Sequence, residues 1–144
     1  MSAERIWTVK LKPWEEDRLR AGHLWVFSNE LETALKDAPA GALAAAVDSN
    51  DKPLGLGFYN PHSLIAWRRL TEKDEPVDEA FFRRRLEEAL RLRQRFYPGS
   101  KSFRLCFGES DGLPGLIVDK YEGVLCLQVL SAGIEARLDV VISA

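Results

Sequence analysis

The sequence has 144 residues, of which 46% are hydrophobic and 29% are charged, a composition that supports one good core or two small ones. A net charge of −2 excludes a uniformly basic nucleic-acid-binding protein. No apolar run is long enough to cross a bilayer, and no basic segment followed by an apolar one opens the chain, so we expect a cytoplasmic protein.

The first half of the chain predicts short strands around one short helix. The strands are expected at residues 5–11, 42–48, 54–59 and 63–70, with another in "LWVFSNEL". The stretch "WEEDRLRAG" predicts a helix that ends at Gly22. Several short strands at close spacing with one small helix predict a small β-barrel or sandwich over about the first seventy residues.

An acidic segment containing Pro76 follows, and we expect a domain boundary between residues 72 and 73. Asp78 is a suitable N-cap for a long connecting helix that stops at Pro98 and Gly99. The expected apolar face of this helix comprises Phe82, Leu86, Ala89, Leu90 and Tyr97. A strand-rich meander comes next, from "FRLCF" through "LIVD" and the turn "KYEG" to "VLCLQVL".

The last segment, "GIEARLDVVISA", predicts one amphipathic helix. Its apolar face comprises Ile134, Leu138, Val141 and Ile142. The segment reaches Ala144 without the glycine, asparagine or basic last turn that usually ends a helix. We therefore expect residues 73–144 to form an incomplete α+β domain, and the chain to be a fragment of a longer protein.

The cysteines and histidines offer little for metal binding or nucleophilic catalysis. Cys106 and Cys126 lie inside apolar runs and are expected to be small buried hydrophobic residues rather than a disulfide. His23 and His62 stand alone, which argues against a zinc site. No nucleophile-elbow motif surrounds Cys106 or Ser110.

The stretch "GESDGLPG", residues 108–115, raises the question of a metal loop, a catalytic pair or a turn. Glu109 and Asp111 have the chemistry of a general acid and base, but carboxylates two residues apart in an exposed turn usually remain ordinary. The glycines and Pro114 favour a turn, with reversal at Asp111 and Gly112.

The arginine-rich stretch of the connecting helix, residues 83–96, holds six arginines against two glutamates. Glutamates at the i,i+4 spacing partly neutralise these arginines, so a solvated face is at least as well supported as an RNA contact.

Two other stretches interleave basic, polar and aromatic residues. The first stretch contains Arg18, Arg20, His23 and Trp25. The second contains Tyr59, Asn60, His62, Ser63, Arg68 and Arg69. Such a set suits phosphate contacts combined with base stacking or sugar hydrogen bonds. For the rings of Trp25, Phe27, Phe58 and Trp67 we favour the alternative of filling a barrel core, whereas for Arg18, Arg20, His23 and Asn60 both interpretations stay open.

Long stretches of the sequence resemble a known protein family. "RLRAGHLWVFSNEL" and "GALAAAVDSNDKPLGLGFYNPHSLIAWRRL" resemble the N-terminal PUA domain of bacterial 23S ribosomal RNA cytosine-5 methyltransferases that use S-adenosylmethionine. "FFRRRLEEALRLR" and "RLCFGESDGLPGLIVDKYEGVLCLQVLSAG" resemble the helix and central domain that follow it. The most specific stretches are "GHLWVF", "GFYNPHS" and "GESDGLPGLIVDKY", although Leu24 stands where a proline is common.

The resemblance implies an α+β chain made of a PUA-like small β-barrel at residues 1–72, then a connecting helix and a truncated central domain at residues 73–144. It implies RNA binding through Arg18, Arg20, Gly22, His23 and neighbouring residues, with Gly22 letting the backbone approach a phosphate. From the second interleaved stretch we add Tyr59, Asn60, Ser63 and Arg68 as candidate RNA-binding residues. The family's catalytic cysteine and S-adenosylmethionine site lie in a further domain, so we expect no catalytic, cofactor or metal residue here.

The expected partner is 23S ribosomal RNA, with a homodimer of the fragment or its parent as a further candidate. The alternative is a structural module that packs on its own catalytic domain, or dimerises, without direct RNA contact. We expect the fragment alone to be catalytically inert.

Overall fold

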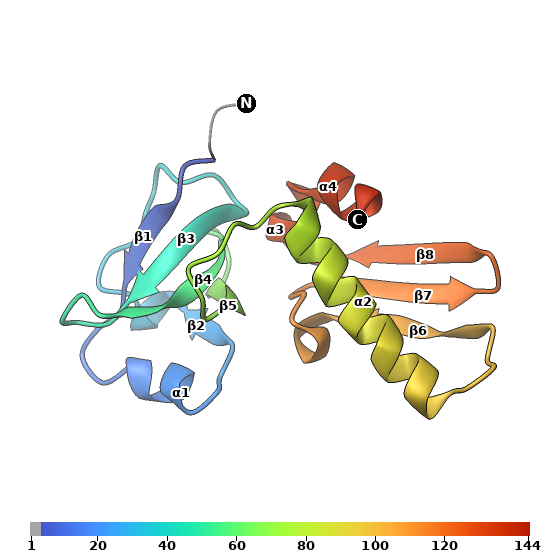
Figure 1. Ribbon diagram of the computed structural model, residues 1–144. Helices are drawn as coiled ribbons and strands as arrows, with labels where there is room; N and C mark the ends of the chain where they lie inside the picture. Colours follow the sequence, from blue (N-terminus) through green and yellow to red (C-terminus); the bar gives the residue numbers. More distant parts are fainter. Residues whose placement is uncertain (1–3) are drawn as a thin grey trace. The chain divides into compact units, whose positions relative to one another are not determined.

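The structure is a computed structural model that describes residues 4–144. The chain folds into two compact units, and it passes from one to the other between Glu75 and Pro76 (Figure 1). The α+β class expected from the sequence is confirmed, because each unit combines a β-sheet with helices. No helix within the described part of the chain is long and apolar enough to span a membrane.

The N-terminal unit is one five-stranded sheet with a short helix. Its elements are β1 (Trp7–Lys10), α1 (Glu16–Arg20), β2 (Trp25–Phe27), β3 (Ala42–Val47), β4 (Pro53–Tyr59) and β5 (Ile65–Thr71), with a 3-10 turn at Ser28–Glu30. The strand order is β1-β3-β4-β5-β2, and only the β1–β3 pair is parallel. The strands expected at residues 42–48 and 54–59 are confirmed, and they pair antiparallel as a hairpin.

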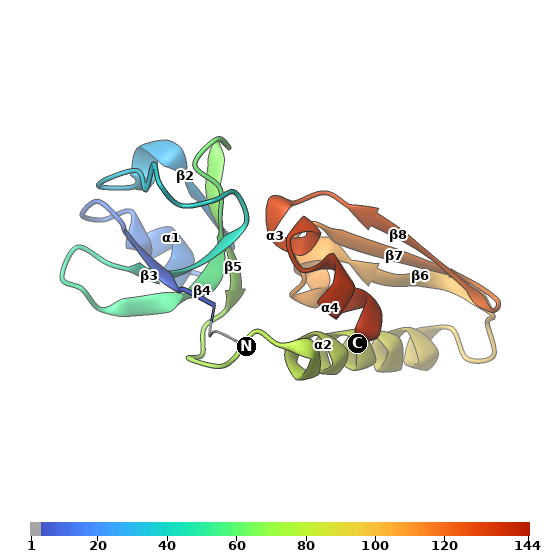
Figure 2. The same cartoon turned by 90° about the horizontal axis from the view of Figure 1, so that it is seen from above.

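The two edges of this sheet come together and close it. Leu11, directly after β1, forms an antiparallel bridge with Leu31, which follows β2. The N–H of Lys12 donates to the carbonyl oxygen of Glu30 at 2.9 Å, and the N–H of Glu32 donates to that of Lys10 at 2.8 Å. Pairing both edges leaves few unpaired backbone groups, and the sheet curls into a small barrel (Figure 2).

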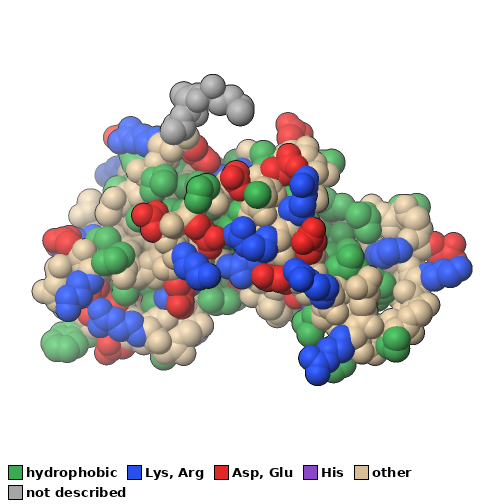
Figure 3. Space-filling model, viewed as in Figure 1, with side chains coloured by type: hydrophobic (Ala, Val, Ile, Leu, Met, Phe, Trp, Pro, Cys, Tyr) green, Lys and Arg blue, Asp and Glu red, His purple; other side chains and the backbone are tan. Residues whose placement is uncertain are grey.

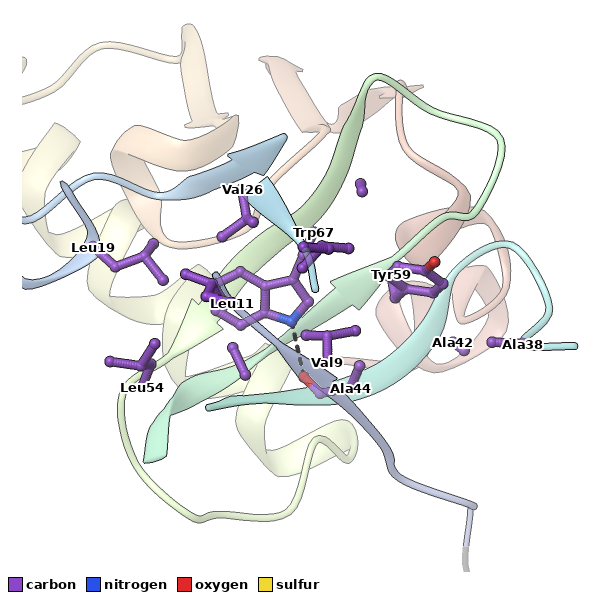
Figure 4. Close-up of a cluster of buried hydrophobic side chains, with 13 residues drawn as sticks. Val9, Leu11, Leu19, Val26, Ala38, Ala42, Ala44, Leu54, Tyr59 and Trp67 are labelled. Carbon is purple, nitrogen blue, oxygen red and sulfur yellow. Dashed lines mark hydrogen bonds between the residues drawn. The ribbon is translucent and has the colours of Figure 1, made fainter. Parts of the chain in front are cut away.

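Trp67 occupies the centre of the barrel. Its side chain is fully buried, and its indole N–H donates to the carbonyl oxygen of Ala44 at 2.9 Å (Figure 4). The ring has room because β4 has a glycine beside it. A Cβ added at Gly57 would lie 2.6 Å from the Cε2 atom of Trp67 and would collide with the carbonyl oxygen of Arg68.

The C-terminal unit is a three-stranded antiparallel sheet packed against a long helix. Its elements are α2 (Glu79–Phe96), β6 (Ser102–Phe107), β7 (Leu116–Tyr121), β8 (Val124–Val129), α3 (Ala132–Glu135) and α4 (Leu138–Ser143), with a 3-10 turn at Gly108–Asp111. The strand order is β6-β7-β8. The sheet lies against α2 in both ribbon views (Figures 1 and 2).

Helix α2 begins and packs largely as the sequence predicts. The side chain of Asp78 accepts a hydrogen bond from the N–H of Phe81 and caps the helix. Phe82 and Ala89 are buried as expected. Tyr97 is not, with 58% of its surface exposed, because it is the C-cap residue, where φ of −127° ends the helical periodicity.

The prediction of one continuous C-terminal helix is wrong, since α3 and α4 are separate. Arg137 interrupts them with a non-helical φ of −124° and a buried side chain that donates to the carbonyl oxygen of Gly133. Ile134 and Val141 are buried as expected, whereas the break leaves Ile142 66% exposed.

The stretch "GESDGLPG" forms a turn, as the sequence predicts, and Gly112 ends it with a left-handed φ of 70°. The carboxylate of Asp111 forms a bidentate ion pair with Arg93 of α2, with one contact at 2.7 Å. It also accepts the N–H of Phe107 at 2.7 Å, while Arg93 Nε donates to the carbonyl oxygen of Arg104 at 3.1 Å. Asp111 therefore fastens this turn, α2 and β6 together.

We predict that Gly57→Ala destabilises the N-terminal unit by about 3 kcal/mol, because the new methyl group overpacks the core at Trp67. Urea unfolding followed by tryptophan fluorescence measures this, since all four tryptophans precede residue 76. Gly123→Ala is the control, because its Cβ would meet nothing within 4 Å. Equal unfolding midpoints for the two variants would contradict the prediction.

We further predict that Asp111→Ala destabilises the C-terminal unit by about 3 kcal/mol, since it leaves the mostly buried guanidinium of Arg93 without its carboxylate. Far-UV circular dichroism of urea unfolding reports the loss through α2. Ser110→Ala, an exposed position in the same turn, should leave stability unchanged. A wild-type unfolding curve for Asp111→Ala would show that the ion pair contributes nothing.

Candidate nucleic-acid interface

The candidate interface lies on the outer face of β2 and the C-terminal end of α1. Val26, the middle residue of β2, is 1% exposed and faces the core. Trp25 and Phe27 therefore point to the other face, because side chains alternate along a strand. Arg68 of β5 lies directly opposite Trp25 in the antiparallel register, so the two share that face.

Guanidinium groups cover both rings of this face. The guanidinium carbon of Arg68 lies 5.3 Å from the centre of the Trp25 ring, and that of Arg18 lies 5.6 Å from the Phe27 ring. Both distances suit cation–π contacts. The arrangement presents flat apolar surface and positive charge side by side.

The expectation that four rings fill the barrel core is therefore confirmed only for Trp67. Trp67 is fully buried in the barrel core, whereas Phe58, although only 3% exposed, lies opposite Arg68 in the β4–β5 register and so is on the other face of the sheet. Trp25 and Phe27 are only partly buried and belong to the outer face. All three residues of "WVF" are hydrophobic, so the sequence alone does not show that Val26 faces the core and its two neighbours face outward.

Arg18 has a structural partner as well as an exposed surface. Its Nη1 lies 2.6 Å from Oε1 of Glu30, whose side chain is 8% exposed, while the Arg18 side chain is 44% exposed. Its Nη2 lies 3.1 Å from Nε2 of the exposed His23. Arg18 thus neutralises a buried carboxylate and still offers guanidinium surface beside His23.

Arg20 points to the turn between β3 and β4. Its Nη2 lies 2.6 Å from Oδ2 of Asp48, whose side chain is 1% exposed. The N–H of Lys52 is the main cause of a lowered pKa for Asp48, and the N–H of Asn50 and the guanidinium of Arg20 lower the pKa of this carboxyl further. Arg20 therefore stabilises the turn with about half of its side chain accessible.

Gly22 has a conformational reason to be glycine. Its φ is +96°, and α1 ends in a Schellman motif. The N–H of His23 donates to the carbonyl oxygen of Arg18 at 2.9 Å, and that of Gly22 donates to the carbonyl oxygen of Leu19 at 3.0 Å. Gly22 lies exposed, with nothing within 4 Å of a Cβ placed there, so its backbone is open to a ligand.

The loop after β4 places Asn60 and Ser63 at the surface. Oδ1 of Asn60 accepts the N–H of His62 at 2.9 Å, an Asx turn, and its carbonyl oxygen accepts the N–H of Ser63 at 3.3 Å. Both residues are partly exposed. Tyr59 is not at the surface: it is 1% exposed, and its hydroxyl accepts the N–H of Leu35 at 3.0 Å (Figure 4).

The arginines of α2 are largely matched by acids. Arg83 pairs with Glu79, Arg91 with Glu87 and Arg85 with Glu88. Figure 3 shows basic and acidic side chains intermixed over this helix. The exposed face of α2 therefore has no strong field of one sign.

The two cysteines lie in different environments. Burial raises the pKa of the Cys106 thiol to about 12, so it stays protonated and shielded from solvent. Cys126 is exposed on β8, contrary to the expectation that both cysteines are buried. Residues 4–144 contain no group of three or more histidine, cysteine, aspartate or glutamate side chains arranged to hold a metal ion.

The chain was compared with known proteins at the levels of sequence and fold. Residues 9–72 match the family model of a PUA-like domain. The whole chain is 42% identical, over 147 aligned residues, to the ribosomal RNA large subunit methyltransferase I of Alteromonas mediterranea, and covers 36% of that protein. The protein of that name from Yersinia pseudotuberculosis is 40% identical over 143 residues, with 95% of this chain and 36% of the relative covered.

Solved structures agree at the level of fold. A Streptococcus mutans protein described as a SAM-dependent methyltransferase matches 95% of this chain and 36% of its own with a TM-score of 0.81 and 13% identity. A methyltransferase complexed with SAH gives the same values. The chain thus spans about a third of the length of these relatives, and its N-terminal unit is a PUA-like domain.

Proposed function

We propose that this chain is the RNA-binding part of an S-adenosylmethionine-dependent methyltransferase that modifies cytosine C5 in 23S ribosomal RNA. The observation that carries the proposal is the outer face of β2, where two arginines lie over two aromatic rings in a PUA-like domain. The similarity along the whole chain to proteins named ribosomal RNA large subunit methyltransferase I supports it.

The chemistry of the face suits a folded RNA. The guanidinium groups of Arg68 and Arg18 and the imidazole of His23 supply donors for phosphate oxygens, and the exposed backbone at Gly22 lets a strand approach closely. The edges of Trp25 and Phe27 offer apolar contact to ribose or base.

The more distant candidates have secondary roles. Asn60 and Ser63 extend the polar surface on the loop after β4. Arg20 reaches RNA only with the part of its side chain that Asp48 does not engage. We omit Tyr59 from the interface because its side chain lies in the core.

Methyl transfer itself would be carried out by a part of the protein that corresponds to the roughly two thirds of the relatives that this chain does not cover. S-adenosylmethionine would bind there, and in this chain we propose no catalytic or cofactor residue. The role of these residues is to hold the ribosomal RNA so that its target base reaches the catalytic domain. The site of action would be the cytoplasm, where ribosomal RNA is processed.

We predict that Arg68→Gln weakens binding of a 23S RNA stem-loop roughly fivefold and lowers the slope of log K against log salt by about 1, because one phosphate contact is lost. Fluorescence anisotropy with labelled RNA at several salt concentrations measures both quantities. Lys52→Gln is the matched control: it removes one exposed charge at the β3–β4 turn.

Alanine variants of Arg18 and Arg20 are poorer tests, because each leaves a buried carboxylate without its partner and perturbs the fold. Wild-type RNA affinity in Arg68→Gln, or equal losses in Arg68→Gln and Lys52→Gln, would contradict the proposed interface.

The alternative is an interaction module that dimerises or packs on its own catalytic domain. It is favoured by an apolar groove of about 630 Å³ in the C-terminal unit, formed by α2, α4 and the sheet. Its apolar lining comprises Leu86, Leu90, Leu105, Val118, Leu125, Leu127, Val129, Leu138, Val141, Ile142 and Ala144. Burial of this surface against a second copy would be insensitive to salt.

For this alternative we predict a salt-insensitive dimer in sedimentation velocity at several protein concentrations. The variant Leu125→Asp, at an exposed position of the groove, should abolish it by placing a charge in the apolar contact. A monomer at every concentration, together with salt-dependent RNA binding, would reject the alternative for the 144-residue chain.

A further inference from the structure

A second surface of the chain combines aromatic rings and guanidinium groups, and it lies entirely in the C-terminal unit. An open cleft of about 440 Å³ is formed by the end of α2 and by β6. Its lining comprises Arg93, Tyr97, Ser102, Phe103, Arg104 and Phe107. No part of the outer face of β2 contributes to it.

The rings of this cleft are accessible in a way that core rings are not. Tyr97 is 58% exposed and Phe107 is 50% exposed. Because these rings are not buried in the core, they contribute little to folding. Their flat surfaces remain accessible to a planar ligand. The guanidinium carbon of Arg104 lies 5.3 Å from the centre of the Phe107 ring, which places a cation next to that surface.

Arg104 also keeps hydrogen-bonding capacity. Its Nε and Nη2 donate to the carboxylate of Asp119 at 2.8 and 3.0 Å. Its Nη1 donates to no group within residues 4–144, and the side chain is 45% exposed. The ion pair with Asp119 therefore holds Arg104 in place while Nη1 remains a donor for an anion.

The rim of the cleft adds positive charge. Lys101 is exposed directly before Ser102, and no carboxylate of the described residues pairs with its ammonium group. Lys120 lies opposite Phe103 in the β6–β7 register, but its ammonium group donates to the carbonyl oxygens of Lys101 and Glu122, so Lys101 is the main cation of the rim. An anionic ligand with flat rings would find charge of the opposite sign next to apolar surface.

The hydrogen bonds at the outer edge of β6 disfavour a peptide as the ligand. A peptide that adds as a strand needs free N–H and carbonyl groups along the edge. Here the carbonyl oxygen of Arg104 accepts from Arg93, and the N–H of Phe107 donates to Asp111. Because these backbone groups are engaged, recognition at the cleft must use side chains.

We propose that this cleft binds an unpaired nucleotide of single-stranded RNA, with the base stacked on Phe107 and Tyr97 and a neighbouring phosphate at Arg104 and Lys101. Paired bases hide their faces in the helix stack, so rings in a cleft select unpaired ones. This contact is separate from the outer face of β2 and does not depend on RNA binding there.

The test uses the 144-residue chain and a fluorescein-labelled oligoadenylate, with a labelled RNA duplex of equal length for comparison. The double variant Tyr97→Ala/Phe107→Ala should bind the single strand at least ~10-fold more weakly, because stacking on aromatic rings contributes strongly per base. Its affinity for the duplex should not change. Circular dichroism verifies that α2 stays folded.

Phe96→Ala is the matched control, because Phe96 is a 68% exposed ring in the same helix turn that does not line the cleft. It should keep wild-type affinity for oligoadenylate. Ultraviolet crosslinking of the wild-type protein to oligoadenylate, mapped by mass spectrometry, gives an independent measurement. The adducts should lie on residue 97, 103 or 107.

No binding of the single strand, equal losses in the double variant and Phe96→Ala, or adducts elsewhere in the chain would overturn the proposal. An aromatic peptide that bound with the same dependence on Tyr97 and Phe107 while RNA did not would assign the cleft to a protein. Loss of stem-loop binding in Arg68→Gln with unchanged oligoadenylate binding in the double variant would refute this cleft and leave the interface on β2 standing.

Discussion

The packing of Trp67 is the constraint on which the N-terminal unit depends. A buried indole must have a hydrogen-bond acceptor, and the Ala44 carbonyl oxygen supplies it at 2.9 Å. The ring reaches that oxygen only because Gly57 has no side chain beside it. Once Trp67 faces inward, the alternation of β5 turns Arg68 outward, opposite Trp25. The position of the proposed RNA contact is thus a consequence of core packing one residue away.

Arginines form ion pairs with three nearly buried carboxylates. The side chains of Glu30, Asp48 and Asp111 are 8%, 1% and 4% exposed, and each pairs with an arginine. Each carboxylate also accepts a backbone N–H from its own turn. Leaving such a charge unpaired is costly, so these arginines stabilise three separate turns. An arginine in such a pair offers only part of its guanidinium group to a nucleic acid, which explains why arginine content alone does not locate the interface.

Local signals made much of the fold predictable. The end of α1 at Gly22, the cap of α2 at Asp78 and the turn at Asp111 and Gly112 each depend on residues within a few positions. The features that the sequence predicted wrongly depend on burial in the folded structure. Tyr59 is buried because its hydroxyl meets the N–H of Leu35, 24 residues away. The break between α3 and α4 follows from the burial of the long polar side chain of Arg137.

The candidate site was predictable in composition and less so in geometry. The sequence identified Arg18, His23 and Arg68, and the structure places two of these over rings. The sequence did not show that these rings are Trp25 and Phe27, because that depends on β2 being an edge strand with one face outside the barrel. An alternating strand does not by itself reveal which of its faces is covered.

The turn at residues 108–115 shows how an apparent catalytic motif can be structural. Asp111 has the chemistry of a general base, but its carboxylate is committed to Arg93 and to the N–H of Phe107. The bond to the N–H of Phe107, together with the bond from Arg93 Nε to the carbonyl oxygen of Arg104, occupies backbone groups at the outer edge of β6 and holds Phe107 at the cleft. Because the carboxylate of Asp111 shapes this edge, it is not available as a base. Recognition at the cleft therefore depends on the exposed rings and on the Nη1 donor of Arg104. The turn positions these groups and does not itself react.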